Sequence, residues 1–286
     1  MTTGVLLFAY NNTAIDYVKQ AIYNAKLIKK HLNLPVVIVT DSVNYLKKTY
    51  PFYNRYVDNV IFKDTEEKNF QTREFFGGEH FSTKAEWKNV NRATAYDISP
   101  FDTTIVLDTD YLINNDNLLK VLDQPDDLFI YKESYDISFS REIKGLERIS
   151  DDTIDFYWAT VLVFKKTERI KKLFDLVNCI KRHYHYFRTL YRITPKLYRN
   201  DYAFSIAIHI LNGYQKTEWP KQPPGKMLYS SPADDLVSIK DGKYIFALGH
   251  DKRPDKVNIV TIKDLNLHIM NKLHLNDLID QEFANE

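Results

Sequence analysis

The chain lacks most of what marks a secreted, fibrous or membrane protein. It holds one cysteine, Cys179, among 286 residues, so no disulfide can form within it, which favours a reducing compartment such as the cytoplasm. Eight glycines and ten prolines predict neither a long flexible linker nor a low-complexity region. No apolar run reaches the roughly 18 residues that a membrane span needs, and the N-terminus lacks the basic start of a signal peptide. We therefore expect a soluble cytoplasmic protein with no membrane partner.

An excess of one charge is also absent overall, because 39 basic and 38 acidic side chains leave a formal net charge of +1. Locally the balance is very different. Residues 165–199 hold eleven lysines and arginines but only two acidic residues, Glu168 and Asp175. Aromatic residues are interleaved with these cations, and such a surface suits phosphate contact and base stacking. The alternative is a solvated helix face that carries ordinary tyrosines.

What is present is a regular alternation of buried strands and amphipathic helices. Residues 5–9 (VLLFA) and 35–40 (PVVIVT) are typical of buried strands, and residues 13–32 between them carry apolar side chains at helical spacing. Strand, helix and strand within forty residues indicate a βαβ unit with a parallel sheet. Ligands in such sheets bind beyond the carboxyl ends of the strands, where Tyr10, Asn11 and Asp41 lie.

The remaining elements follow from the same periodicities. Apolar runs predict strands at 128–131, 160–164, 244–248 and 257–262, and helical spacing covers 167–190 and 200–212. Residues 64–83 are polar and predict a mobile loop that could act as a lid. Thr83 and Glu86 fit a capping box, which predicts a helix from there to about Ile98. Lys84, Lys88 and Arg92 would then recur on one basic helix face.

Two aspartates interrupt the buried run TIVLDTDYLI at residues 104–113. Burying one carboxylate is costly, and two like charges side by side are worse. In an extended backbone, Asp108 and Asp110 point to the same side and converge on one point. A divalent cation such as Mg²⁺ or Mn²⁺ removes the charge problem and can share its oxygen ligands with a diphosphate. The alternative is a solvated turn with no ligand.

These motifs together resemble the GT-A glycosyltransferases, which use nucleotide sugars. The resemblance lies in YDISPFDTTIVLDTDYLI at 96–113, in the N-terminal strand and helix, and in VVIVTD at 36–41. It implies a GT-A fold, an α/β architecture whose mixed, mostly parallel sheet is flanked by helices. It also implies one domain over residues 1–286, with a nucleotide-sugar half at 1–113 and an acceptor half at 114–286.

The resemblance assigns donor-side roles to particular positions. A UDP-sugar is the expected donor, with Mn²⁺ or Mg²⁺ as cofactor. The residues that would contact the nucleotide sugar are Ala9, Tyr10, Asn11, Asp41, Lys84, Arg92, Asp108 and Lys272. The metal ligands would be Asp108, Asp110 and a late histidine. His268 is preferred over His250 because its neighbours are apolar, whereas His250 lies in a polar loop with Lys252.

Chemistry follows from these assignments. A metal held by two aspartates and a histidine acts as a Lewis acid on the departing nucleoside diphosphate. Lys272 would add a positive charge to the same oxygens, and Asp110 takes part through the metal. Asp201 would hold the donor sugar or act as base, or would serve only as a helix N-cap.

The acceptor side is assigned from the basic segment and from YWATVLVF at 157–164, which resembles the acceptor-side strand of the family. The expected acceptor contacts are Trp158, Arg182, His185, Arg188 and Arg192. The composition of the chain, which is rich in Tyr, Asn and Lys, also resembles that of enzymes of T-even-like bacteriophages. Those enzymes glycosylate or arabinosylate 5-hydroxymethylcytosine in DNA. DNA is therefore the expected acceptor, reached by flipping the base. Two alternatives stay open: the same chemistry on a glycan, lipid or protein, and a non-catalytic nucleic-acid-binding protein.

Overall fold

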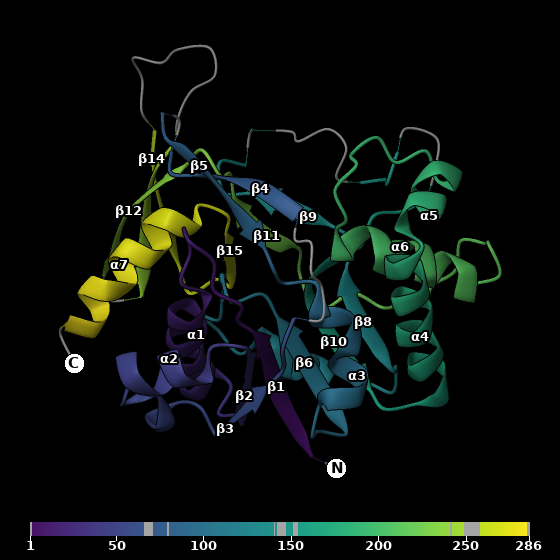
Figure 1. Cartoon of the computed structure of the whole chain (residues 1–286), viewed down its shortest axis with the longest axis horizontal. Helices are drawn as coiled ribbons and strands as arrows, with labels where there is room; N and C mark the ends of the chain where they lie inside the picture. Colours follow the sequence, from purple (N-terminus) through teal and green to yellow (C-terminus); the bar gives the residue numbers. More distant parts are fainter. Residues whose placement is uncertain are drawn as a thin grey trace.

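The computed structural model describes residues 2–65, 71–78, 80–139, 141, 147–150, 154–240, 242–248 and 258–284. At its centre is a six-stranded sheet in the order β3-β2-β1-β6-β10-β8 (Figure 1). Its strands are β1 (Thr3–Phe8), β2 (Val36–Thr40), β3 (Asn59–Phe62), β6 (Thr103–Leu107), β8 (Leu128–Tyr131) and β10 (Trp158–Lys165). The first four in the sheet order are parallel, and β10 runs antiparallel to both of its neighbours. This confirms the predicted fold class, a mixed, mostly parallel sheet with helices around it.

Helices cover the sheet on both flanks (Figure 1). The helices are α1 (Tyr17–His31), α2 (Val43–Thr49), α3 (Ala95–Ile98), α4 (Glu168–Arg182), α5 (Tyr184–Leu190), α6 (Asn200–Leu211) and α7 (Lys272–Ala284). Three short 3₁₀ turns are η1 (Tyr53–Arg55), η2 (Asn91–Thr94) and η3 (Asn117–Val121). Helix α7, from the end of the chain, packs against α1, where Lys19 pairs with Asp280 at 2.7 Å. The chain therefore returns to its first helix. No described helix is long and apolar enough to cross a membrane.

Three smaller sheets complete the described fold. One has the order β7-β15-β11-β9, from β7 (Tyr111–Leu112), β15 (Leu267–Ile269), β11 (Met227–Ser230) and β9 (Ser134–Asp136). A second is the antiparallel set β12 (Asp235–Lys240), β13 (Lys243–Leu248) and β14 (Asn258–Lys263). The third is the hairpin of β4 (Gln71–Phe76) and β5 (Ser82–Trp87). The pairing of β15 with β7 brings residue 268 beside residue 111, so the late histidine is held next to the aspartate turn.

The predicted helix from Thr83 to Ile98 is wrong. Residues 82–87 form strand β5, and only the 3₁₀ turn η2 and the short helix α3 follow it. The burial alternates along β5, with Ala85 and Trp87 inside, and a period of two is that of a strand. Cross-strand pairing with β4 therefore outweighs the capping box. Lys84, Lys88 and Arg92 lie on a strand, a loop and η2, and they form no common helix face.

The other predicted elements are present. The expected strands coincide with β8, β10, β13 and β14, and the expected helices with α4, α5 and α6. The polar loop at 64–83 is in part the β4–β5 hairpin, while residues 66–70 and 79 lie outside the described residues. His250 and Lys252 also lie outside them. The division into halves at residue 113 stays a prediction.

Candidate active site

One large cavity opens at the carboxyl ends of the parallel strands, and its volume is about 770 Å³. Its walls come from the turn after β6, the start of β10, the start of α6, the end of β15 and the β4–β5 hairpin. Segments far apart in the sequence therefore meet at one place. The expected site residues Asp108, Asp110, Asp201, His268 and Lys272 all line this cavity.

Asp108 and Asp110 belong to a tight turn rather than to an extended strand. Strand β6 ends at Leu107, and the Tyr111 N–H donates to the Asp108 carbonyl at 3.1 Å. The predicted extended geometry is therefore wrong at this point, but the turn also brings the two carboxylates together. The Asp108 N–H donates to the Thr160 carbonyl of β10 at 2.9 Å, which fixes where the turn begins.

Two buried polar residues of α1, Gln20 and Asn24, form hydrogen bonds with the same turn. The Gln20 side chain accepts from the Thr109 hydroxyl at 3.1 Å and donates to Asn276 of α7 at 2.8 Å. The Asn24 side chain donates to the Tyr111 carbonyl at 2.7 Å. Neither Gln20 nor Asn24 was predicted from the sequence. Their signal is the spacing of two amides, four residues apart, on the apolar face of a helix.

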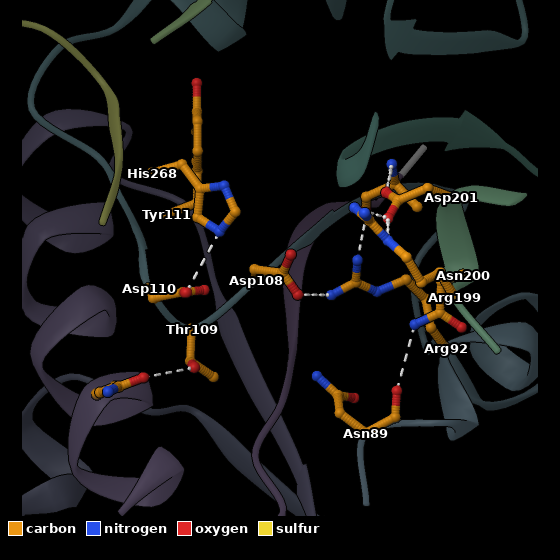
Figure 2. Close-up of polar contacts among 12 residues, drawn as sticks. Asn89, Arg92, Asp108, Thr109, Asp110, Tyr111, Arg199, Asn200, Asp201 and His268 are labelled. Carbon is orange, nitrogen blue, oxygen red and sulfur yellow. Dashed lines mark hydrogen bonds and ion pairs between the residues drawn. The ribbon is translucent and has the colours of Figure 1, made fainter. Parts of the chain in front are cut away.

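The late histidine completes a three-sided group of ligand atoms. Asp108, Asp110 and His268 each offer one atom, and these atoms lie within 4.8 Å of one another. The His268 Nε2 is 3.3 Å from an Asp110 oxygen, and Figure 2 shows the ring facing that carboxylate. Two carboxylates and an imidazole form a donor set that suits Mn²⁺ and related divalent cations. The residues present therefore fit a metal centre.

Side-chain cations neutralise both carboxylates in the structure. The Lys272 ammonium donates to Asp110, and the Arg92 guanidinium donates to Asp108 and to the Ala159 carbonyl. Burial alone would raise the pKa of the Asp110 carboxyl, but Lys272 and His268 beside it hold that pKa well below its usual range. Asp110 is therefore charged at neutral pH, ready to hold a cation.

A third ion pair, between Arg199 and Asp201, also lines the cavity. Asp201 accepts from the Ala159 N–H at 2.9 Å and pairs with Arg199 at 2.7 Å (Figure 2). Helix α6 begins at Asn200, and no side chain caps it, so the N-cap alternative for Asp201 does not hold. Ala159 joins the two sides, because its carbonyl accepts from Arg92 and its N–H donates to Asp201.

The β4–β5 hairpin brings the expected residue Lys84 to the cavity, together with Arg73 and Trp87, which were not among the expected site residues. Arg73 of β4 lies 3.5 Å above the Trp87 ring of β5, and Lys84 lines the cavity beside them.

Tyr17 of α1 also lines the cavity, and its buried hydroxyl has no hydrogen-bond partner among the described residues. Burial, followed by the nearby Asp110, raises the pKa of the Tyr17 phenol. Its hydroxyl is therefore protonated at neutral pH.

A second cavity of about 560 Å³ lies at the ends of β1 and β2, and Asn11, Asp16, Ser42 and Tyr45 line it. Consecutive residues of α7 line the two cavities, Lys272 the large one and Leu273 the second. Of the residues expected around the nucleotide, Asn11 lines the second cavity. Ala9 and Tyr10 are buried in the core, and Asp41 lines neither cavity.

The expected acceptor residues divide into two groups. Trp158 lines the large cavity, is 1% exposed and stacks on Tyr229 with ring centroids 5.7 Å apart. The other four lie on α4, α5 and the following loop, and none of them lines the cavity: Arg182, His185, Arg188 and Arg192. Arg188 is occupied locally, since its guanidinium donates to the carbonyls of residues 194 and 195 at 3.2 and 3.1 Å.

Comparison with known proteins finds similar proteins only among solved structures. No family model and no curated protein matches the chain. A galactosyltransferase, LgtC, solved with donor and acceptor sugar analogues, is 15% identical, with 71% of this chain and 70% of that chain covered and a TM-score of 0.46. The glycosyltransferase GlyE of Streptococcus pneumoniae TIGR4 is 15% identical, with 76% and 45% covered and a TM-score of 0.37.

Nucleotidyltransferases are also among the similar structures. A putative glucose-1-phosphate thymidylyltransferase from Bacillus anthracis is 10% identical, with 74% of this chain and 84% of that chain covered and a TM-score of 0.37. These identities and scores are too low to carry an argument about activity. The activity of this chain therefore has to follow from the chemistry of its cavity.

Proposed function

We propose that the protein is a metal-dependent glycosyltransferase that takes its sugar from a nucleotide sugar, a UDP-sugar being the first candidate. The observation that carries this proposal is the convergence of Asp108, Asp110 and His268 within 4.8 Å, at the edge of a 770 Å³ cavity that also holds Lys272. Two carboxylates at a strand end suit a cation that shares its ligands with a diphosphate.

The roles of the chain's own residues follow from their contacts. When bound, the metal supplies Lewis acidity toward the leaving diphosphate. Lys272 is placed to bind a diphosphate oxygen, because its ammonium already contacts the ligand Asp110. Arg92 orients Asp108 and, through Ala159, the backbone that holds Asp201. The carboxylate of Asp201, which lines the same cavity, can then bind a sugar hydroxyl or accept its proton.

For the acceptor, the observation that favours DNA is the charge of residues 165–199. Lys171, Lys172 and Arg182 are exposed on α4, and Lys196 is exposed on the loop after α5. Pro195 and Leu197 of this loop line the cavity, so the basic surface continues to its mouth. A nucleobase that accepts the sugar must carry a hydroxyl group, because the sugar is transferred to a hydroxyl oxygen. The candidate acceptor base is therefore 5-hydroxymethylcytosine. A glycan, lipid or protein acceptor is the rival within the same chemistry.

The metal site is tested by binding of UDP in the presence and absence of Mn²⁺, measured by calorimetry. Asp108→Asn should abolish the Mn²⁺-dependent part of UDP binding. His268→Gln should weaken that part at least tenfold while leaving the ion pairs of Asp108 with Arg92 and of Asp110 with Lys272 in place. Asp123→Asn, at an exposed carboxylate outside the cavity, is the matched control. Circular dichroism of each variant shows whether it is folded.

Turnover is tested with a panel of nucleotide sugars, Mn²⁺, and DNA with or without hydroxymethylcytosine. The mass of the modified nucleoside then names the sugar and the acceptor together. A folded Asp108→Asn protein with unchanged Mn²⁺-dependent UDP binding would overturn the proposed function.

A further inference from the structure

Arg73 is held in the cavity by contacts that leave most of its donors free of described residues. The central carbon of its guanidinium, Cζ, lies 3.5 Å from the centroid of the Trp87 ring, and one terminal nitrogen donates to the Tyr198 carbonyl. Its Nε is buried and has no hydrogen-bond partner in the described part of the chain. A planar guanidinium fixed in this way presents a preformed fork, the geometry that binds a carboxylate or phosphate.

Arg73 forms no ion pair among the described residues, because the two carboxylates whose charge reaches it, Asp201 and Asp108, are paired with other arginines. Three of the lining cations are paired: Arg92 with Asp108, Lys272 with Asp110 and Arg199 with Asp201. The remaining lining acid, Glu74, is exposed and accepts from the Ser82 hydroxyl at 2.6 Å. Among the described residues no carboxylate pairs with Arg73. A partly buried cation without a counterion is costly, so this position favours an anion from outside.

A second guanidinium belongs to Arg199, the residue after Tyr198, whose carbonyl accepts from Arg73, and both arginines line the cavity. Burial, followed by the positive charge of Arg199, lowers the pKa of Arg73 to about 10. Arg199 in turn is fixed by Asp201 and lies over the Phe156 and Tyr202 rings at 5.5 and 5.4 Å. The two arginines come from β4 and from the residue before α6, so only the folded chain brings both to the same cavity.

We propose that Arg73, supported by Arg199, forms an anion subsite next to Asp201 that binds a carboxylate or phosphate group of one of the two substrates. The inference rests on the proposed function and deepens it, because it names a property of the substrate. Arg73 comes from the hairpin, whereas Lys272 and the proposed metal ligands come from β15, α7 and the turn after β6, and all of them line the same cavity. The anion belongs to the transferred sugar, as in a uronic acid, or to the acceptor, as in a phosphodiester.

The test is calorimetry on the full chain saturated with Mn²⁺ and UDP, so that the diphosphate site is filled. The probes are methyl phosphate and D-glucuronate, with uncharged D-glucose as reference. We expect both anions to bind and to compete with each other, Arg73→Gln to weaken both at least tenfold, and Arg73→Lys to weaken them less. Lys48→Gln, which removes an exposed cation from α2, should change nothing.

Two further titrations locate the anion. If UDP-glucuronate binds more tightly than UDP-glucose and Arg73→Gln removes the preference, the anion is on the transferred sugar. If the two donors bind equally and methyl phosphate binds alongside UDP-glucose, it is on the acceptor. Normal binding of Mn²⁺ and UDP without binding of either anion, or with an unaffected Arg73→Gln, overturns the subsite and leaves the proposed function standing. Failure of UDP itself to bind overturns both.

Discussion

At the scale of single residues, Asp110 is the point where a protein cation and a metal ion would compete. Its carboxylate is 3% exposed, and the same oxygen faces Lys272 and His268. The ammonium compensates the buried charge as long as no metal is present. A divalent cation would take over this role and release Lys272 toward the diphosphate. In the proposed function, this one residue would link metal binding to the preparation of the donor site.

Lys272→Met should therefore lower the stability of the metal-free protein and increase the response to metal. Removing one partner of a buried ion pair costs about 3 kcal/mol, measured as the free energy of unfolding in urea. Mn²⁺ should raise the melting temperature of the variant more than that of the wild type, because it no longer competes with the ammonium. Lys226→Met removes a surface partner of Glu133 and should leave stability nearly unchanged. Equal Mn²⁺ shifts in wild type and Lys272→Met would contradict the competition.

At the scale of elements, the β4–β5 hairpin decides the shape of the cavity. It supplies Arg73, Lys84 and Trp87 to the lining, and it packs on α7 and β12 through its tip. Gly78 has φ +85°, and a Cβ there would collide with the Asp235 carboxylate of β12. Only glycine combines this backbone conformation with so close an approach. The hairpin is thus docked at its tip and presents its strands to the ligand space.

Gly78→Ala should disturb this docking and with it the binding of the donor. Gly213→Ala is a matched control, since its φ is +65° and a Cβ added there would meet nothing within 4 Å. Both variants carry left-handed backbone strain of about 1–2 kcal/mol, and the collision should add about 1 kcal/mol or more at Gly78. Urea unfolding measures the difference in stability. Binding of UDP with Mn²⁺ should weaken only in Gly78→Ala, and equal binding by both variants would argue against a role for the docked tip.

At the scale of the whole molecule, charge is separated even though the net charge is +1. Residues 165–199 carry a surplus of nine positive charges, and α4 and α5 place much of it on one flank of the molecule (Figure 1). The apolar stripe of α4 is buried, with Ile170, Leu173 and Val177 inside. Its lysines therefore face outward, where they can contact a polyanion.

If DNA is the acceptor, binding of a duplex should weaken steeply with salt, because each phosphate contact releases a counterion. Lys171→Gln with Lys172→Gln should reduce the slope of log K against log salt by about 2. The pair Lys47→Gln and Lys48→Gln, exposed on α2, should leave the slope unchanged. Fluorescence anisotropy measures the slopes of both double variants. The titration runs between about 50 and 200 mM salt, because DNA binding through phosphate contacts loses orders of magnitude in affinity over that range. No binding of a duplex at low salt would favour a glycan, lipid or protein acceptor.

The sequence by itself determined the elements whose signal is local. The apolar runs of β1, β2 and β6 and the helical spacing of α1 and α4 are properties of short stretches, and the structure contains them. Asp108 and Asp110 could be singled out because two carboxylates after a buried run are costly without a partner. His268 and Lys272 could be placed near them only through the family resemblance, since more than half of the chain lies between Asp110 and His268.

Tertiary structure alone decided the features that depend on distant partners. Residues 82–87 became a strand because β4 was available to pair with them, although Thr83 and Glu86 fit a helix start. Gln20 and Asn24 contact the aspartate turn because that turn packs on α1, and Arg73 reaches the cavity because the hairpin carries it there. The physical reason is common to all three. Hydrogen bonds and ion pairs across the fold have energies comparable to local propensities, and no short stretch of sequence contains both partners.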